Sequence, residues 1–337
     1  MKNRINNMNL LPILILSVWL GACTGSNKNY YNCEGRTQGT MYHVIYEHNE
    51  DISDEINSFL VDFSKSLSNY DRNSVISKFN YNAKDFKPDS LLITMLTASQ
   101  EVWQKTEGAF DITVAPVANL WGFGWEKPGN IDTSRIVALM QYVGMNKISI
   151  SGQQITKQYP EVMIIGNGIA QGLSVDCLAY FLESKGISNY LIEIGGEVCA
   201  KGYKANSELW KIGIDKPINS SYSNRQNQTV LSLTDWSLAT SGNYRKFVEM
   251  GQKTYGHSIN PKTGYPAKTD VLSVTVATRQ CMYADAYATA FMVIGFEKSF
   301  ELAKKIPDLE AYFIYIAPDS THQVAYTDGF DKFLLDE

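Results

Sequence analysis

The sequence predicts one α+β body with mixed or antiparallel sheets and packed helices. Meander-like strands mix with helices along its 337 residues, without the regular strand–helix units of a parallel fold. No internal repeat or low-complexity linker divides the chain, and 44% of its residues are hydrophobic. A chain of this size buries one large core or two fused lobes, and the lack of a boundary favours one body.

Strands are predicted where β-branched residues alternate with other residues or form short apolar runs. The first is Met41–Tyr46. The apolar run VMII at 162–165 predicts a strand that ends at Gly166, and a strand at 190–193 precedes Gly195 and Gly196. Further strands are expected at 211–214, 229–233, 272–277 and 311–316.

Helices are predicted where apolar residues recur every three or four positions. The segment from Ile52 to Phe63 has this spacing, and a second helix is expected over 89–106. A third helix is expected from about Ser174 to Lys185, followed by Gly186 where a C-terminal cap would lie. The fourth covers 285–294.

The N-terminus has the form of an export signal. Lys2 and Arg4 precede an apolar run from Leu10 to Leu20, which is shorter than the roughly 20 apolar residues that a membrane-spanning helix needs. Gly21 and Ala22 then precede Cys23, as in a bacterial lipobox. We expect a signal peptide at 1–22, a lipidated (palmitate-bearing) Cys23, a polar tether over 23–34 and a folded domain over 35–337. The protein would then be exported and anchored to the cell membrane by lipid, facing the periplasm. The alternative is a short buried helix that ends at a free cysteine.

Charge and cysteine content exclude two classes of protein. The net charge is −5 and no block of consecutive Lys or Arg occurs, so nucleic acid is not an expected partner. The remaining cysteines form no C-x-x-C pair, which argues against a zinc site; they are Cys33, Cys177, Cys199 and Cys281. Buried thiols are expected, with a disulfide as the alternative.

Three stretches concentrate glycine with acidic or hydroxyl residues. The first, Gly166 to Asp176, has three glycines at a turn into a helix, where a backbone can cradle an anion or make an ordinary tight turn. The second is ADAYATA at 284–290. A helix there places Asp285 and Thr289 on one face, where they could hold Mg²⁺, although Asp285 could equally cap the helix. The third, 255–264, places His257 in a polar turn, where a histidine is either catalytic or simply solvated.

Together with EGAFDIT at 107–113 and LSNYD at 67–71, these stretches resemble the ApbE family of FAD:protein FMN transferases. The resemblance spans nearly the whole mature chain, and the elements follow the family's order. It includes TQGT at 37–40, YLIEIGGEV at 190–198, SLATSGNYR at 237–245 and GHSINPKTGYP at 256–266.

The resemblance implies an activity and a set of site residues. FMN would be transferred from FAD to a Ser or Thr hydroxyl of a partner protein, such as a redox-pump subunit, with release of AMP. Mg²⁺ would be held by Gly168, Asp285 and Thr289, and His257 would be the base. FAD, as substrate, would contact a further set of residues: Gln38, Tyr70, Ala109, Phe110, Asp111, Gln171 and Ile259. The resemblance also implies a fold related to the T-fold.

The chain departs from the family pattern at three positions. Gln38 replaces the usual Met, Ile165 replaces a frequent Asp and Gln171 replaces a frequent Lys. Losing the last two charges together leaves no buried partner alone. Two alternatives stay open: an Mg²⁺-dependent FAD pyrophosphatase that gives free FMN and AMP, and a non-catalytic FAD-binding lipoprotein.

Overall fold

The computed structural model describes residues 29–127, 131–215, 227–242, 247–250, 253–256 and 258–335. An eight-stranded sheet forms its centre, and each neighbouring pair of strands is antiparallel. The strands in spatial order are β1 (Asn29–Thr37), β2 (Thr40–His48), β5 (Tyr190–Ile194), β6 (Glu197–Lys201), β9 (Trp236–Gly242), β12 (Val271–Thr278), β13 (Glu310–Ile316) and β14 (His322–Tyr326).

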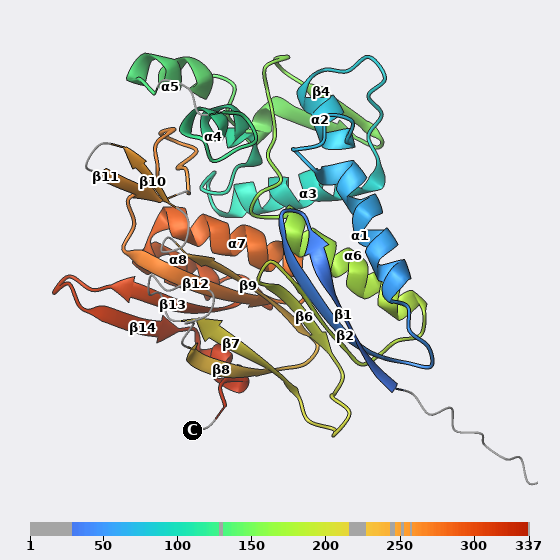
Figure 1. Cartoon of the computed structure of the whole chain (residues 1–337). Coiled ribbons are helices and arrows are strands. Elements are labelled where there is room, and N and C mark those ends of the chain that lie inside the picture. Colours follow the sequence, from blue (N-terminus) through green and yellow to red (C-terminus); the bar gives the residue numbers. More distant parts are fainter. Residues whose placement is uncertain are drawn as a thin grey trace, which may run out of the picture.

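Helices lie over one face of this sheet (Figure 1). The helices are α1 (Ser53–Leu67), α2 (Val75–Asn80), α3 (Ser90–Lys105), α4 (Ala115–Trp121), α5 (Thr133–Met140), α6 (Ala170–Ser184), α7 (Cys281–Ile294) and α8 (Phe296–Ala303). Three two-stranded sheets complete the described structure: β3 (Ile148–Ser151) with β4 (Gln154–Lys157), β7 (Trp210–Asp215) with β8 (Asn227–Leu233), and β10 (Phe247–Met250) with β11 (Lys253–Gly256). None of the helices among the described residues has the length and apolar character needed to span a membrane.

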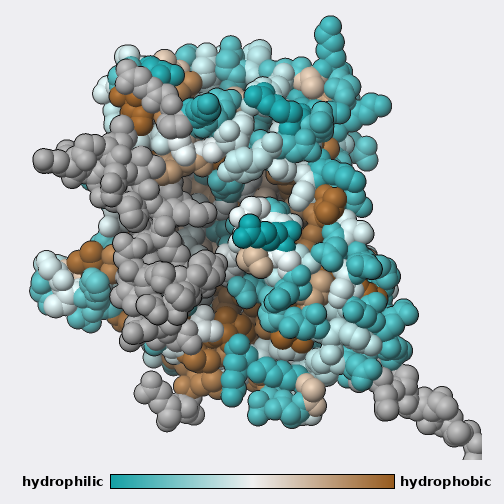
Figure 2. All heavy atoms as spheres, viewed as in Figure 1, coloured by the Kyte–Doolittle hydropathy of each residue, from teal (hydrophilic) through white to brown (hydrophobic). Residues whose placement is uncertain are grey.

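The alternation of side chains along the strands divides the core into layers. Val274, Val276 and Phe313 point to the helical side and join the largest cluster, which includes α3 and α7. Their neighbours Ala277 and Tyr312 belong to a cluster on the other side, with β7, β8 and the C-terminal turn. Figure 2 shows polar side chains over most of the described surface in this view, with apolar side chains gathered where β7 and β8 lie in Figure 1.

The predicted α+β class, with antiparallel sheets and packed helices in one body, is confirmed. The four described cysteines are free, as expected. Gly186 has a φ of +77° directly after the last residues of α6, as the predicted C-terminal cap requires. The helices α6 and α7 each begin four residues before the predicted start, at Ala170 and Cys281.

The predicted tether ends too late. Residues 29–34 form the first part of β1, which pairs with β2 along its full length. Their polar composition suggested a tether, but Cys33 is buried and the Tyr31 ring stacks on Tyr46 at 5.6 Å between centroids. Tertiary pairing therefore outweighs local composition here.

The predicted strand at 162–165 is wrong, because this extended segment pairs with no strand. Asparagine side chains take the place of a ladder. Asn80 accepts the Ile164 N–H at 2.8 Å and donates to the Ile164 carbonyl at 2.8 Å. Asn69 donates to the same carbonyl at 3.0 Å and accepts the Gly166 N–H at 2.9 Å. The buried backbone is thus satisfied without a sheet.

Candidate active site

The three predicted metal ligands lie together where α7 meets the turn before α6. Asp285 and Thr289 are one helical turn apart on α7. Gly168 has a φ of +85°, and a Cβ atom placed on it would lie 2.6 Å from the Thr289 Oγ1. Only glycine allows this contact. Asp285 is buried, and its Oδ2 accepts the Gly172 N–H at 3.2 Å.

Two carboxylates lie near this place, and burial raises the pKa of both. Burial raises the pKa of Asp285 to about 7; the Gly172 N–H lowers it, and the nearby Asp176 raises it. Burial also raises the pKa of Asp176 to about 7, although the Cys281 and Met282 N–H groups act in the opposite direction. Among the described residues, no cationic side chain contributes to either pKa. A bound cation would offset this cost of burial.

The donor chemistry fits Mg²⁺. A carboxylate, a hydroxyl and a backbone carbonyl are oxygen ligands of the kind that hard cations prefer, and Mg²⁺ typically adds substrate phosphates to a few protein ligands. Within the described part of the chain, no three His, Cys, Asp or Glu side chains gather to hold a metal alone. The site therefore suits a metal shared with a phosphorylated substrate better than a closed structural metal site.

The N-terminus of α6 supplies anion-binding groups at the same place. The N-cap residue Ile169 makes no side-chain cap hydrogen bond. In the turn around it, the Ala170 N–H donates to the Gly166 carbonyl at 2.9 Å. A helix begins with N–H groups that have no helical partner and a partial positive charge. This end of α6 can therefore bind a phosphate.

Gln38 contacts the start of α6, and Gln171 belongs to the first turn of that helix. The Gln38 Nε2 in the β1–β2 turn donates to the Ser174 Oγ at 2.7 Å. The Gln171 Nε2 lies 2.4 Å from where a Cβ on Gly195 would be, in the β5–β6 turn. The β1–β2 and β5–β6 turns of the sheet thus contact the start of α6 through Gln38 and Gln171.

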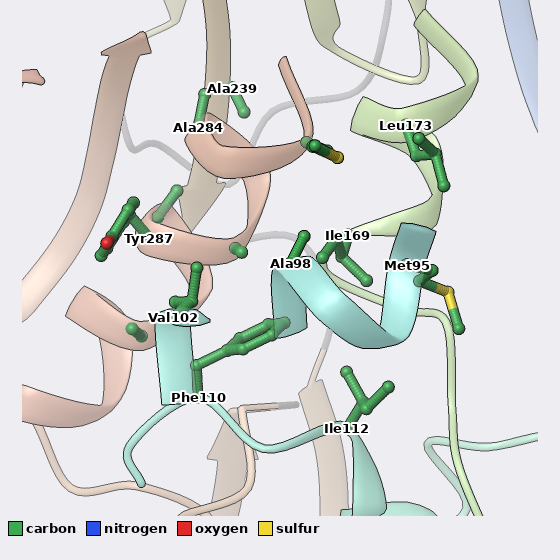
Figure 3. Close-up of a cluster of buried hydrophobic side chains, with 14 of the residues drawn as sticks. Met95, Ala98, Val102, Phe110, Ile112, Ile169, Leu173, Ala239, Ala284 and Tyr287 are labelled. Carbon is green, nitrogen blue, oxygen red and sulfur yellow. The ribbon is translucent and has the colours of Figure 1, made fainter. Parts of the chain in front are cut away.

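The EGAF segment also reaches the Gly-rich turn, but its side chains are buried. Figure 3 shows Phe110 beside Val102 of α3, in the core cluster that also includes Ile169. Asp111 accepts the Thr113 and Met145 N–H groups at 2.8 and 3.1 Å, and its burial raises its pKa. Ala109 is buried as well. A ligand would meet this segment through its backbone, since the side chains are occupied by the fold.

The remaining predicted residues lie at the edge of the site. Tyr70 is 72% exposed and directly follows Asn69, which holds the Gly-rich turn. Ile259 is buried in a cluster with Trp121. In the same turn, the Lys262 Cε lies 3.9 Å from where a Cβ on Gly108 would be, so the turn adjoins the EGAF segment. His257 and Cys23 lie outside the described residues.

Three residues around the site received no role of their own from the sequence, namely Asn69, Asn80 and Asp176, and the sequence identifies Gly172 only as one of three glycines in a turn. The two asparagines lie 95 and 84 residues from Ile164, so no local pattern connects them with it. Gly172 and Asp176 did carry a signal, because with Gly168 they recur every fourth residue and so line one face of a helix.

Comparisons with known proteins place the chain in a family. Residues 38–313 match the family model described as ApbE family. A FAD:protein FMN transferase from Vibrio cholerae is 36% identical over 89% of this chain and 91% of its own length. One from Haemophilus influenzae is 35% identical over 94% of this chain and 95% of its own length.

Solved structures give the same result. The flavin transferase ApbE from Vibrio cholerae superposes with a TM-score of 0.81 at 31% identity, covering 91% of this chain and all of that chain. The apo form of the flavinyl transferase ApbE from Pseudomonas stutzeri gives a TM-score of 0.78 at 28% identity, covering 91% of this chain and 97% of that chain. With its matching family model, close relatives and shared fold, the chain belongs to the ApbE family.

Proposed function

We propose that this chain transfers FMN from FAD to a Ser or Thr hydroxyl of a partner protein and releases AMP, with Mg²⁺ as cofactor. One observation carries the proposal: on α7, Thr289 meets Gly168 and Asp285, one turn away, accepts the Gly172 N–H at the start of α6. The similar proteins are named for the same transfer. FAD offers the pyrophosphate that such a site suits.

The described residues would bind and orient the substrate. Asp285, Thr289 and the Gly168 carbonyl would hold the ion, and the Gln171 N–H in the first turn of α6 would bind a phosphate oxygen. When bound, Mg²⁺ would neutralise pyrophosphate charge and stabilise the departing AMP. The exposed ring of Tyr70 would offer a surface for the isoalloxazine or adenine ring.

The transfer itself exchanges the phosphoanhydride bond between the FMN and AMP halves of FAD for a phosphoester bond. The acceptor hydroxyl oxygen forms a bond to the FMN phosphorus while the bond from that phosphorus to the AMP oxygen breaks. The hydroxyl proton passes to His257, the base that the family resemblance implies. The product is FMN joined to the partner through a phosphoester.

The transfer is tested by incubating residues 24–337 with FAD and Mg²⁺, with and without a candidate acceptor domain. We expect AMP release together with flavin fluorescence that stays on the denatured acceptor. AMP with free FMN only would instead identify a pyrophosphatase. Tight FAD binding without either product would identify a storage protein.

The role of His257 is tested separately. His257→Ala should slow transfer at saturating FAD by roughly 100-fold or more, because a positioned base contributes about 10²–10⁴-fold. The affinity for FAD, measured by equilibrium dialysis, should change little. Equal losses in rate and affinity would make His257 a binding residue.

We further propose that the chain is exported and anchored by lipid at Cys23. The lipobox form of Leu20 to Cys23 supports this, and so does the short distance along the chain to Asn29, where β1 begins. Growth on radiolabelled palmitate should label the wild type and leave Cys23→Ser unlabelled. Equal labelling of both would place the lipid elsewhere.

A further inference from the structure

The helices α6 and α7 meet along a regular seam, defined here by Gly168, Gly172 and Asp176 and the α7 residues that each of them contacts. Gly168 faces Thr289, Gly172 faces Asp285 and Cys281, and Asp176 faces Cys281 and Met282. From Gly168 to Gly172 to Asp176 the chain advances by four residues each time. The facing residues on α7, Thr289, Asp285 and Cys281, go back by four each time. The two helices are therefore antiparallel in one fixed register.

Close contact between the backbones sets the middle of the seam. A Cβ on Gly172 would lie 2.5 Å from the Cys281 carbonyl oxygen and 2.7 Å from the Met282 Cα. Since real Cβ atoms do not approach so closely, no other residue fits here without moving α7. The Gly172 N–H also reaches Asp285, so the register and the ligand position are set together.

Asp176 caps the N-terminus of α7 from a different helix. Its two oxygens accept the Cys281 N–H at 2.7 Å and the Met282 N–H at 2.9 Å. The residue at the N-cap of α7 itself, Gln280, makes no side-chain cap hydrogen bond. Asp176 thus satisfies two N–H groups that the helix leaves free, at the end where a negative charge is favourable.

The Asp176 carboxylate lines a cavity of about 490 Å³ whose walls include Phe59, Phe63, Leu91 and Leu173. These two hydrogen bonds and the contact at Gly172 hold the first turn of α7 against α6, while the Cys281 thiol contacts the Val198 and Leu238 carbonyls of the sheet. Thr289 lies eight residues further along the helix, roughly 12 Å at 1.5 Å per residue, so a tilt at this end moves the ligands.

We propose that Asp176 is a positioning residue: by capping α7 it sets the register in which Thr289 meets Gly168 and Asp285 meets Gly172. This inference rests on the proposed Mg²⁺ site. Metal ligands must lie within about 0.2 Å of their ideal distances. Partners that hold metal ligands typically contribute 10–100-fold to metal affinity. Asp176 touches neither the ion nor the substrate and acts through α7.

The test compares Asp176→Asn with Asp89→Asn. Asn has one acceptor oxygen and turns an amide toward the second N–H, so one of the two bonds is lost. Asp89 is a matched control, because it caps α3 through the Leu92 N–H at 2.9 Å and lies in another helix. Mn²⁺ is titrated into each protein, with FAD present, and the free ion is followed by electron paramagnetic resonance.

We expect Asp176→Asn to weaken Mn²⁺ binding at least tenfold, while Asp89→Asn, whose amide oxygen can still cap α3, binds like the wild type. In FAD cleavage, the Mg²⁺ concentration for half activity should rise equally, with kcat at saturating Mg²⁺ within threefold of the wild type. Binding within twofold of the wild type by Asp176→Asn, or equal weakening in both variants, would overturn the proposal.

Two further outcomes are separable. If the wild type binds no Mn²⁺, the proposed metal site fails and the positioning role fails with it. If Asp176→Asn does not fold, Asp176→Glu makes the same comparison, because it keeps the charge and both acceptor oxygens but is longer by one methylene. We expect Asp176→Glu to fold and to bind Mn²⁺ more weakly than the wild type; wild-type affinity would overturn the proposal.

Discussion

The Gly-rich turn at 166–169 is held from two sides by different means. On one side, the amide side, Asn69 and Asn80 satisfy the backbone of Ile164 and Gly166 completely. On the other side, the seam between α6 and α7, glycine brings two backbones together and buries carboxylates without a cationic partner among the described residues. A satisfied network stabilises, whereas buried unpaired charge is available for a ligand. Changes on the seam should therefore affect activity, and changes on the amide side should affect stability.

The largest effect is expected for Asp285→Asn on the seam. FAD cleavage with Mg²⁺ should fall by about 10³-fold or more, as expected for removing a charged group that acts in a buried site. The metal-free protein should melt at the same temperature or higher, because a neutral amide avoids the burial that raises the pKa of Asp285. AMP release and thermal melting in chelator measure the two effects.

The control for Asp285→Asn is Asp85→Asn, which removes an exposed carboxylate paired with Lys78 and should leave turnover unchanged. Turnover of Asp285→Asn within tenfold of the wild type would remove Asp285 from the metal site. A sharp drop in metal-free stability would show that Asp285 serves the fold.

Gly172→Ala should have the next largest effect. Helix propensity alone would make this change stabilising by about 1 kcal/mol. The contact with Cys281 and Met282 should reverse the sign and cost about 1–3 kcal/mol, because α7 must move away. Activity should fall roughly 100-fold as the ligands separate. Urea unfolding and AMP release test this, and a more stable, active variant would refute the close contact.

Asn80→Ala tests the amide side. It removes both hydrogen bonds to Ile164 and leaves a buried N–H without its acceptor, which should cost about 2–3 kcal/mol of the free energy of unfolding. Activity at 25 °C should stay within about threefold while the variant is folded. The exposed Gln141→Ala serves as control and should change stability by less than about 0.5 kcal/mol. A loss of activity larger than the loss of folded protein would mean that the amide side affects activity as well as stability.

Gln38→Met should have the smallest effect. The variant restores the residue usual in the family and loses the hydrogen bond from Gln38 to Ser174, worth about 1 kcal/mol. The affinity for FAD, followed by quenching of flavin fluorescence, should change by no more than about fivefold. A change beyond 50-fold would identify Gln38 as a direct and specific contact with FAD.

The two sides also differ in how far the sequence predicts them. The spacing of Asp285 and Thr289 and the helix that carries them are local patterns, so both are predicted, as are the strands around Met41 and Ala311. The interaction of Asn80 with Ile164 spans 84 residues and leaves no local pattern, so the run VMII is mistaken for a strand. The early start of α6 is missed because Gly172 disfavours a helix, and its contact with α7 is not visible in the local sequence.

We propose that one ion binds where the seam meets the Gly-rich turn. Mn²⁺ prefers the same octahedral oxygen ligands as Mg²⁺, and its anomalous scattering locates it in a crystal. In crystals grown with Mn²⁺ and FAD, we expect a peak among the Gly168 carbonyl, Asp285 and Thr289, next to the FAD phosphates. A Mn²⁺ peak away from these three residues, with FAD bound, would contradict the account.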